Sequence, residues 1–214
     1  MHSINDQENS NLLISEEKID RRSFLQKTAL TISGVGFLGT MPIFAKSCEL
    51  TEYPFTMGVA SGEPLQDGIV LWTRLAPKPL AGGGMPDQTF PVNWEIASDS
   101  EFLQIVQKGT ELATKDLGHS VHVEVGNLQS GQNYWYRFKS GNFESPTGKT
   151  KTAPNAGTDL QEMKFAIASC QNYASGYYTA YDHMVNEDLD VILFLGDYIY
   201  EKGSGANALR KHLP

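Results

Sequence analysis

The stretch from Lys164 to Glu201, KFAIASCQNYASGYYTAYDHMVNEDLDVILFLGDYIYE, decides the fold of the second half of the chain. Two short apolar runs, 165–168 and 191–195, have the length of buried strands. The segment between them is amphipathic and repeats apolar or aromatic side chains at helical spacing: Tyr177, Ala180, Tyr181, Met184 and Val185. Strand, helix, strand in this order is the βαβ pattern, whose crossover makes the two strands parallel. The sequence therefore predicts a parallel strand pair.

Each predicted strand leads to side chains that can bind a metal ion. Cys170 follows the first strand, Asp197 follows the second, and Tyr200 comes three residues later. Parallel strands put their carboxyl ends on the same edge of a sheet, where open α/β sheets bind ligands. A carboxylate there can bridge two ions, and a phenolate suits a hard ion such as ferric iron. We therefore expect one metal site at this edge.

Each of these residues also has a purely structural interpretation. Asp197 could cap a following helix or turn, and Tyr200 could pack or face water. Cys170 could be a small buried apolar residue, as free cysteines usually are. A disulfide with Cys48, the other of the 2 cysteines, is a further alternative in an exported protein.

The remaining polar candidates near the predicted site are weaker. Gln171 and Asn172 follow Cys170 directly and could reach the same site, although loop polarity explains them equally well. His119 and His122 are three residues apart in a strand-like segment, so they face opposite sides and cannot share a metal ion. His183 lies among polar neighbours on the predicted helix, and we expect it to be solvated.

The first half of the chain reads as β structure from about residue 55 to 154. Gly, Pro, Asp and Ser clusters separate short alternating runs at 69–74, 92–97, 121–125 and 134–139. This pattern is typical of a small sandwich, with 101–108 as a short helical or irregular insert. Leu128, Gly131 and then Tyr134-Trp135-Tyr136-Arg137-Phe138 resemble the fibronectin type III pattern, in which the corner tyrosine bonds to the backbone upstream.

The amino terminus has the features of a targeting segment. Arg21-Arg22 stands directly before Ser23-Phe24-Leu25 and a weakly apolar run over 28–45, as in a twin-arginine signal. A chance arginine pair before an amphipathic helix is the alternative. The run is too rich in glycine to predict a permanent membrane span. We expect cleavage after Ala45, with a lipoprotein box at Cys48 as the minor alternative.

Composition limits the classes of function. The chain has 214 residues, 40% of them hydrophobic, and a formal net charge of −8. This charge argues against a surface that wraps nucleic acid. It does not exclude a phosphate-bearing substrate, because bound metal ions can reverse the local field.

Several motifs together resemble the PhoD-type alkaline phosphatase family of the metallophosphoesterase superfamily. The resemblance extends from the twin-arginine signal to Glu201. The motifs that carry it are Met57–Pro64, Val70–Pro77, Ser169–Tyr173, Gly176–Tyr181 and Leu195–Glu201.

This resemblance implies a fold, an activity and a metal centre. The implied fold class is multidomain β plus α/β: a signal peptide over 1–47, a fibronectin III-like sandwich over 52–154, and the beginning of the catalytic domain over 160–214. The implied activity is hydrolysis of phosphomonoesters or phosphodiesters outside the cytoplasm, for phosphate acquisition. Cys170 and Tyr200 would bind iron, and Asp197 would bridge it to calcium. No catalytic side chain is assigned, because the implied nucleophile is a water molecule activated by the metals.

Further expectations concern the state of the protein. One helix cannot cover both faces of a parallel strand pair, so we expect this chain to be an amino-terminal fragment of a longer protein. The resemblance places the family's remaining Asn, Asp and His ligands downstream, which implies that this fragment is inactive. The whole protein is expected to be a periplasmic or secreted monomer exported by the twin-arginine machinery. Two rivals remain: an exported sandwich that acts as a binding module beside a vestigial second domain, and a metal-free pseudoenzyme.

Overall fold

The computed structural model describes residues 50–212 of the chain. The predicted signal peptide, its cleavage site and Cys48 lie outside the described residues. Among the residues described, no helix is long and apolar enough to cross a membrane.

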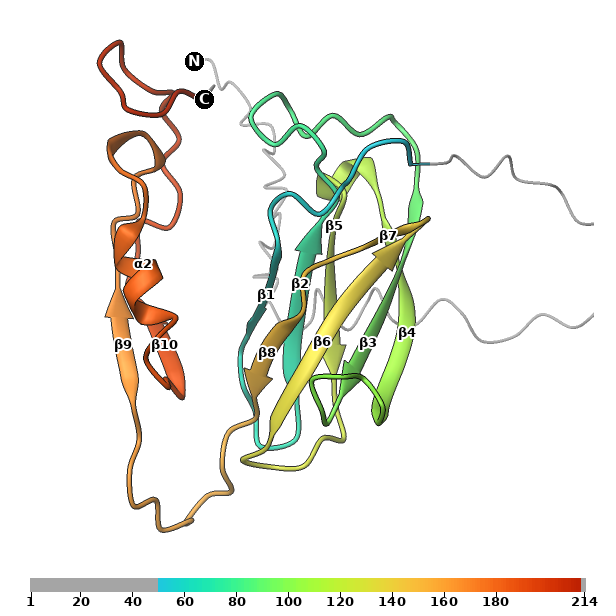
Figure 1. The fold of residues 1–214 in the computed structure, drawn as a ribbon, viewed down its shortest axis with the longest axis vertical. Helices are drawn as coiled ribbons and strands as arrows, with labels where there is room; N and C mark the ends of the chain where they lie inside the picture. Colours follow the sequence, from blue (N-terminus) through green and yellow to red (C-terminus); the bar gives the residue numbers. More distant parts are fainter. Residues whose placement is uncertain (1–49, 213–214) are drawn as a thin grey trace, which may run out of the picture. The chain divides into compact units, whose positions relative to one another are not determined.

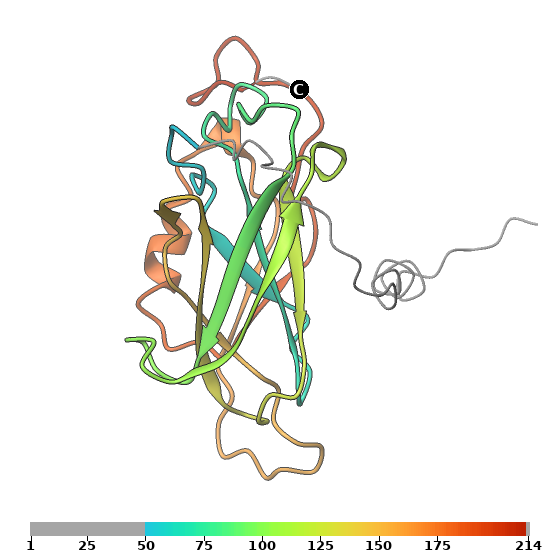
Figure 2. The same cartoon turned by 90° about the vertical axis from the view of Figure 1, so that its right-hand side faces the viewer.

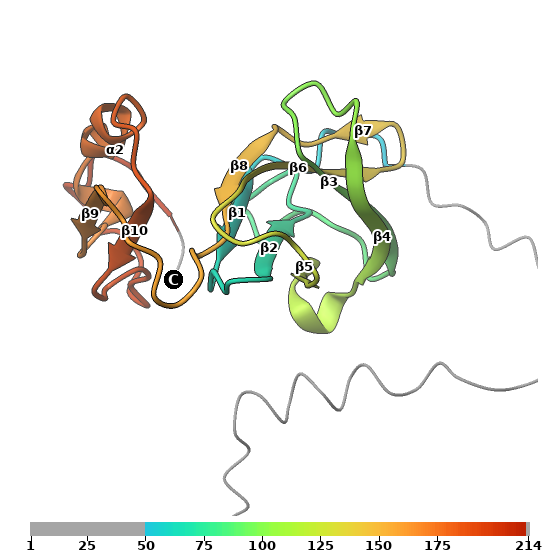
Figure 3. The same ribbon diagram turned by 90° about the horizontal axis from the view of Figure 1, so that it is seen from below.

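Residues 59–151 form the two sheets of a β-sandwich, as Figures 1 and 3 show. The first sheet has the antiparallel order β1-β2-β5, with β1 at Val59–Gly62, β2 at Ile69–Arg74 and β5 at Ser120–Val125. The second has the order β4-β3-β6-β7, and β8 also pairs with β6. Its strands are β3 at Phe90–Ala97, β4 at Ile105–Ala113, β6 at Asn133–Ser140, β7 at Phe143–Glu144 and β8 at Gly148–Lys151. The predicted sandwich is confirmed.

The core of the sandwich follows from side chains that alternate along the strands. In β2, Ile69, Leu71 and Thr73 are buried while the residues between them are half-buried. The same alternation in β3, β5 and β6 turns one face of each strand inward. Figure 2 shows the strands of the sandwich from a second side. The inward residues include Val92, Ile96, Val121, Val123, Val125, Tyr136 and Phe138.

The tyrosine corner is present as the sequence predicts. Tyr134 is 3% exposed, and its hydroxyl oxygen accepts a hydrogen bond of 2.9 Å from the backbone N–H of Gln129. Leu128, just upstream, is buried in the same core. The contact fixes the crossover between β5 and β6, which is the role of such corners in fibronectin-like sandwiches.

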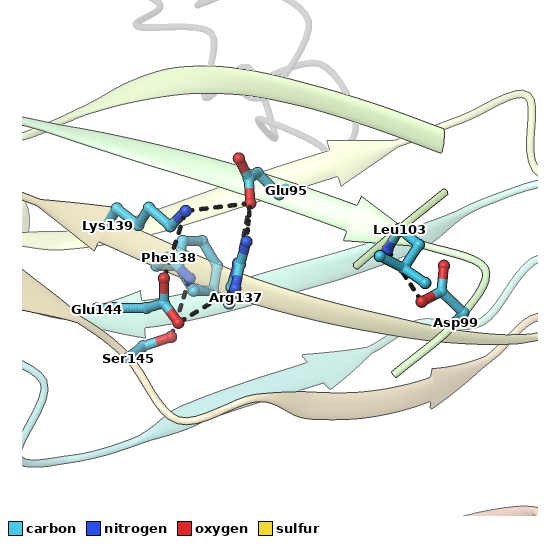
Figure 4. Close-up of polar contacts among 8 residues, drawn as sticks. All are labelled: Glu95, Asp99, Leu103, Arg137, Phe138, Lys139, Glu144 and Ser145. Carbon is cyan, nitrogen blue, oxygen red and sulfur yellow. Dashed lines mark hydrogen bonds and ion pairs between the residues drawn. The ribbon is translucent and has the colours of Figure 1, made fainter. Parts of the chain in front are cut away.

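The prediction of a short helical or irregular insert over 101–108 is wrong for residues 105–108. Residues from Ile105 onward belong to β4, which pairs with β3 along its whole length. Only the turn before it is irregular: the Asp99 carboxylate accepts hydrogen bonds from the N–H groups of Glu101, Leu103 and Gln104, at 3.0, 3.0 and 2.7 Å. Figure 4 shows the contact with Leu103. The strand was not predicted because it lies at the sheet edge, is mostly exposed and lacks alternating apolar residues.

A network of charged side chains covers the outer face of β3 and β6 (Figure 4). The Arg137 guanidinium lies 2.8 Å from the Glu95 carboxylate and 3.2 Å from that of Glu144, and Lys139 contacts both carboxylates. Desolvation raises the pKa of Glu95, but Arg137 and Lys139 outweigh it and leave that pKa below its usual value. The network joins neighbouring strands across the sheet.

The second half of the chain forms the predicted parallel pair. The strands β9, Phe165–Ala168, and β10, Val191–Phe194, pair in parallel with Phe165 opposite Val191. A short 3-10 turn η2, Tyr173–Ser175, and the helix α2, Thr179–Met184, lie between them (Figure 1). The βαβ prediction is confirmed, and with it the fold class of a fibronectin III-like sandwich followed by the start of an α/β unit.

The Asp190 carboxylate joins the starts of both parallel strands. One of its oxygens accepts a 2.9 Å hydrogen bond from the Lys164 N–H, just before β9, and the other pairs with the ammonium group of Lys151 in β8. The hydrogen bond from Lys151, followed by that from Lys164, lowers the pKa of Asp190.

The parallel pair keeps much of its apolar surface exposed. Phe165 and Ile167 are both 56% exposed, and Ile192 is 52% exposed. This agrees with the expectation that one helix does not cover both faces of such a pair.

Candidate metal centre

Each parallel strand is followed by residues whose backbone is in the left-handed region. Cys170 has φ 56°, Asp197 has φ 52°, and Gly196 before it has φ 129°. The strands stay joined beyond their last paired residues, because Leu195 N–H donates to Ala168 O at 2.9 Å and Cys170 N–H donates to Gly196 O at 3.1 Å. Glycine tolerates this region and aspartate visits it more readily than most residues. The two turns therefore bring Cys170 and Asp197 to the same edge.

The three predicted ligands converge on one oxygen atom. The Cys170 Sγ lies 3.6 Å from Asp197 Oδ2, and the Tyr200 hydroxyl donates a hydrogen bond to the same oxygen at 3.1 Å. The sequence thus predicted the juxtaposition of all three side chains, and the structure brings them together.

The donor set and its spacing fit a metal ion. Donor atoms about 2.0–2.3 Å from one ion, at angles between a right angle and the tetrahedral angle, lie roughly 2.8–3.8 Å apart. The separations of 3.1 and 3.6 Å around Asp197 fall in this range. A carboxylate and a phenol offer oxygen to hard cations, and a thiol adds a softer anionic ligand.

The charge at this edge favours a cation. The pKa of Tyr200 is raised to about 12, first by its partial removal from water, and then by the neighbouring Asp197 carboxylate and Cys170 thiol. Negative neighbours oppose formation of a further anion, and a bound cation would remove that opposition. Without a cation, the Tyr200 hydroxyl therefore keeps its proton at neutral pH and donates a hydrogen bond to the Asp197 carboxylate.

The structural alternatives for these residues find little support among residues 50–212. No helix follows Asp197 there for it to cap, and its side-chain partners are Cys170 and Tyr200. Cys170 is an exposed free thiol, not a buried apolar residue. Tyr200 is 38% exposed and so partly faces water, but its hydroxyl is bound to Asp197.

Gln171 and Asn172 brace the loop that carries Cys170. The Gln171 amide donates to Tyr198 O at 3.0 Å and accepts from the Tyr181 hydroxyl at 2.9 Å. The Asn172 side chain accepts from the Ala174 N–H at 2.9 Å, and so caps the 3-10 turn η2. These contacts account for both side chains without ligation.

Of the two histidines expected in one strand, His122 lies in β5 but His119 lies in the turn before it. His119 is 6% exposed, and its Nε2 lies 2.9 Å from Gln88 O, whereas His122 is exposed and contacts the Trp72 ring edge-on. His183 is exposed on α2. Within the described part of the chain, no group of three or more His, Cys, Asp or Glu side chains is arranged to hold a metal ion. The candidate centre has two such residues and adds a tyrosine.

A cavity beside Tyr200 was not predicted from the sequence. It has a volume of about 990 Å³, and the segment 199–209 forms much of its wall together with Asn172, Ser175 and His212. His212 also meets the Tyr173 ring edge-on, with centroids 5.7 Å apart. These segments lack apolar periodicity, so only the folded chain brings them beside the strand ends.

Comparisons with known proteins agree with this architecture. Residues 43–154 match the family model described as "PhoD-like phosphatase, N-terminal domain", and residues 165–213 match "PhoD-like phosphatase". The first model covers the sandwich and the second covers the α/β unit, so both parts of the chain match domains of a phosphatase family. The chain belongs to the PhoD-like phosphatase family.

Two relatives give the extent of the similarity. The chain is 53% identical over 189 residues to alkaline phosphatase D of Bacillus subtilis (strain 168). This alignment covers 86% of this chain and 32% of the relative. A solved structure of PhoD superposes with a TM-score of 0.70 at 59% identity, covering 72% of this chain and 30% of that one. The chain therefore spans about a third of the curated relative's length.

Proposed function

We propose that the whole protein hydrolyses phosphomonoesters or phosphodiesters outside the cytoplasm, at a metal centre built in part by Cys170, Asp197 and Tyr200. The observation that carries the proposal is the convergence of a thiol and a phenol on Asp197 Oδ2, at 3.6 and 3.1 Å. Membership of the PhoD-like phosphatase family supports the reaction class, and supply of phosphate is the role that we infer for it.

The three side chains have distinct proposed roles. Cys170 and Tyr200 would hold iron through a sulfur and an oxygen anion, and Asp197 would offer its carboxylate to both iron and calcium. Metal ions in such a centre stabilise charge on phosphoryl oxygens and acidify an attacking water molecule. The left-handed turns at Cys170 and Asp197 present both side chains to the open edge of the sheet, and Gly196 supplies the φ of 129° that glycine adopts without strain.

We propose the domain limits that the sequence indicates. The sandwich takes residues 52–154, which encloses β1 to β8, and the catalytic domain starts at 160, shortly before β9. Residues 1–47 are proposed as a twin-arginine signal that directs a monomer to the periplasm or the exterior. The proposed metal centre fits this route, because a protein can receive metal ions before export in the folded state.

Changing Arg21→Lys together with Arg22→Lys should leave the precursor of the whole protein in the cytoplasm. The reason is that the signal is read through its paired arginines. Fractionation followed by immunoblotting measures the outcome, with Lys18→Arg as a control outside the pair. Export of the double variant at the wild-type level would overturn the proposed route.

Chelation should abolish the hydrolysis that we propose. The whole protein, treated with a strong chelator and desalted, is expected to lose activity on p-nitrophenyl phosphate and bis-p-nitrophenyl phosphate by at least about 10³-fold. Ferric iron plus calcium should restore it. A chelated protein that stays fully active contradicts a metal mechanism. A protein inactive with all metals supplied, but with its sandwich intact, would favour the binding-module rival.

A further inference from the structure

Arg210 lies in a cage of tyrosine rings. Its guanidinium carbon is 3.9 Å from the ring centroid of Tyr173, 4.4 Å from that of Tyr178 and 5.4 Å from that of Tyr177. Its Nε also donates a 2.9 Å hydrogen bond to the Tyr173 carbonyl. Arginine stacks well on aromatic faces, so the ring contacts and the hydrogen bond together hold the guanidinium of Arg210 in place.

The cage joins two segments that are far apart in sequence. Beside the Arg210 contacts, the Leu209 N–H donates to Ala174 O at 3.0 Å. Residues 209–210 are therefore fixed to 173–178, which follows Cys170 by only a few positions. Tyr178 continues the connection, since its hydroxyl lies 3.5 Å from the carbonyl oxygen of Gln171.

Cys170 needs such support from its surroundings. Its φ of 56° is unfavourable for a residue with a Cβ, and an unfavourable backbone persists only where neighbouring contacts determine it. The residue is also exposed, so packing does not hold the thiol in place. Contacts on both sides of the turn must therefore fix the position of Sγ.

We propose that Arg210 is a positioning residue for the metal centre. By holding Tyr173 and Tyr178, it keeps the 170–178 loop folded and so keeps Cys170 Sγ beside Asp197 Oδ2. The inference rests on the proposed function, because it gives the loop a role in ligand geometry.

The chemistry of the cage requires arginine and not merely a positive charge. Arg210 Nη2 is buried without a hydrogen-bond partner among the described residues, so the contacts come from Nε and the flat faces of the guanidinium. Lysine has a compact ammonium group with neither a planar face nor an Nε donor placed this way. Arg210→Lys should therefore behave like Arg210→Ala.

The test compares the whole protein with Arg210→Ala, Arg210→Lys and, as the matched control, loss of the exposed neighbouring cation in Lys211→Ala. Hydrogen exchange is measured first in metal-free protein. Peptides from 170–178 should exchange about 10-fold faster in both Arg210 variants, with β9 and β10 unchanged. Ferric iron is then titrated, and the affinity should fall by about 10-fold or more, as for other residues that orient ligands. Lys211→Ala should match wild type in both measurements.

The outcomes of the exchange and iron-binding measurements distinguish this proposal from the proposed function. Unchanged exchange in whichever Arg210 variant folds overturns the proposal, because the loop would not depend on the cage. Faster exchange with wild-type iron affinity also overturns it, and leaves the proposed function intact. Rescue by Arg210→Lys contradicts the planar-stacking argument. If wild-type protein binds no iron and Tyr200→Phe behaves identically, the proposed function fails and this inference fails with it.

Discussion

Asp197→Asn should reduce phosphoester hydrolysis by the whole protein by at least about 10³-fold, because the shared oxygen anion at the centre is lost. Asp197 Oδ2 is the atom on which both Cys170 Sγ and Tyr200 OH converge. An amide keeps the shape of the side chain but brings no negative charge and replaces one acceptor oxygen with a donor. Both proposed ions should therefore be held more weakly.

The same substitution should leave the fold intact, so the loss can be assigned to chemistry. Asp197 has φ 52°, and asparagine tolerates the left-handed region as aspartate does. The matched control is Asp182→Asn, the same chemical change at an exposed position on α2. Initial rates with p-nitrophenyl phosphate are compared at equal folded concentration. Activity of Asp197→Asn within a few-fold of the control would show that this carboxylate does not act at the reaction centre.

Gly148→Ala should destabilise the sandwich by about 2–3 kcal/mol, the cost of overpacking a filled core. Gly148 in β8 stands opposite Tyr136 in β6, and a Cβ there would lie 2.3 Å from Tyr136 Cζ. The Tyr136 side chain is 2% exposed, and burial raises its pKa to about 12. The ring therefore has little room to move away from an added methyl group.

Urea denaturation of the 214-residue chain measures this effect. Trp72, Trp94 and Trp135, the 3 tryptophans, all lie in sandwich strands, so their fluorescence reports the unfolding of that domain. The control is Gly126→Ala, where an added Cβ meets no atom within 4 Å. This control should change the free energy of unfolding by less than about 1 kcal/mol. Equal midpoints for the two variants would contradict the packing of Tyr136 against β8.

The site geometry was predictable because it follows from topology. Once 165–168 and 191–195 are read as strands with a helix between them, the parallel pairing places Cys170 and Asp197 together. Tyr200 could be predicted as part of the same site because it follows Asp197 by only three residues in sequence. The buried strands of the sandwich were predictable for a similar reason, since one inward face gives a period of two.

The features that could not be predicted, strand β4 and the Arg210 cage, lack such local periodicity. The strand β4 is an edge strand with polar residues on both faces, and its pairing with β3 supplies its order. Arg210 contacts Tyr173 across more than thirty-five residues of sequence, and an arginine among polar and small residues gives no local signal of a cage. Such contacts depend on tertiary structure, which pattern and propensity do not encode.

The visible absorption spectrum of the whole protein loaded with ferric iron tests the central claim most directly, that Cys170, Asp197 and Tyr200 belong to one metal centre. A tyrosinate bound to ferric iron produces a charge-transfer band. Tyr200→Phe removes the phenol oxygen and keeps the ring, so the band should disappear. The matched variant Tyr198→Phe, at a neighbouring tyrosine that is 62% exposed, should keep it. A band that persists unchanged in Tyr200→Phe would contradict the assignment.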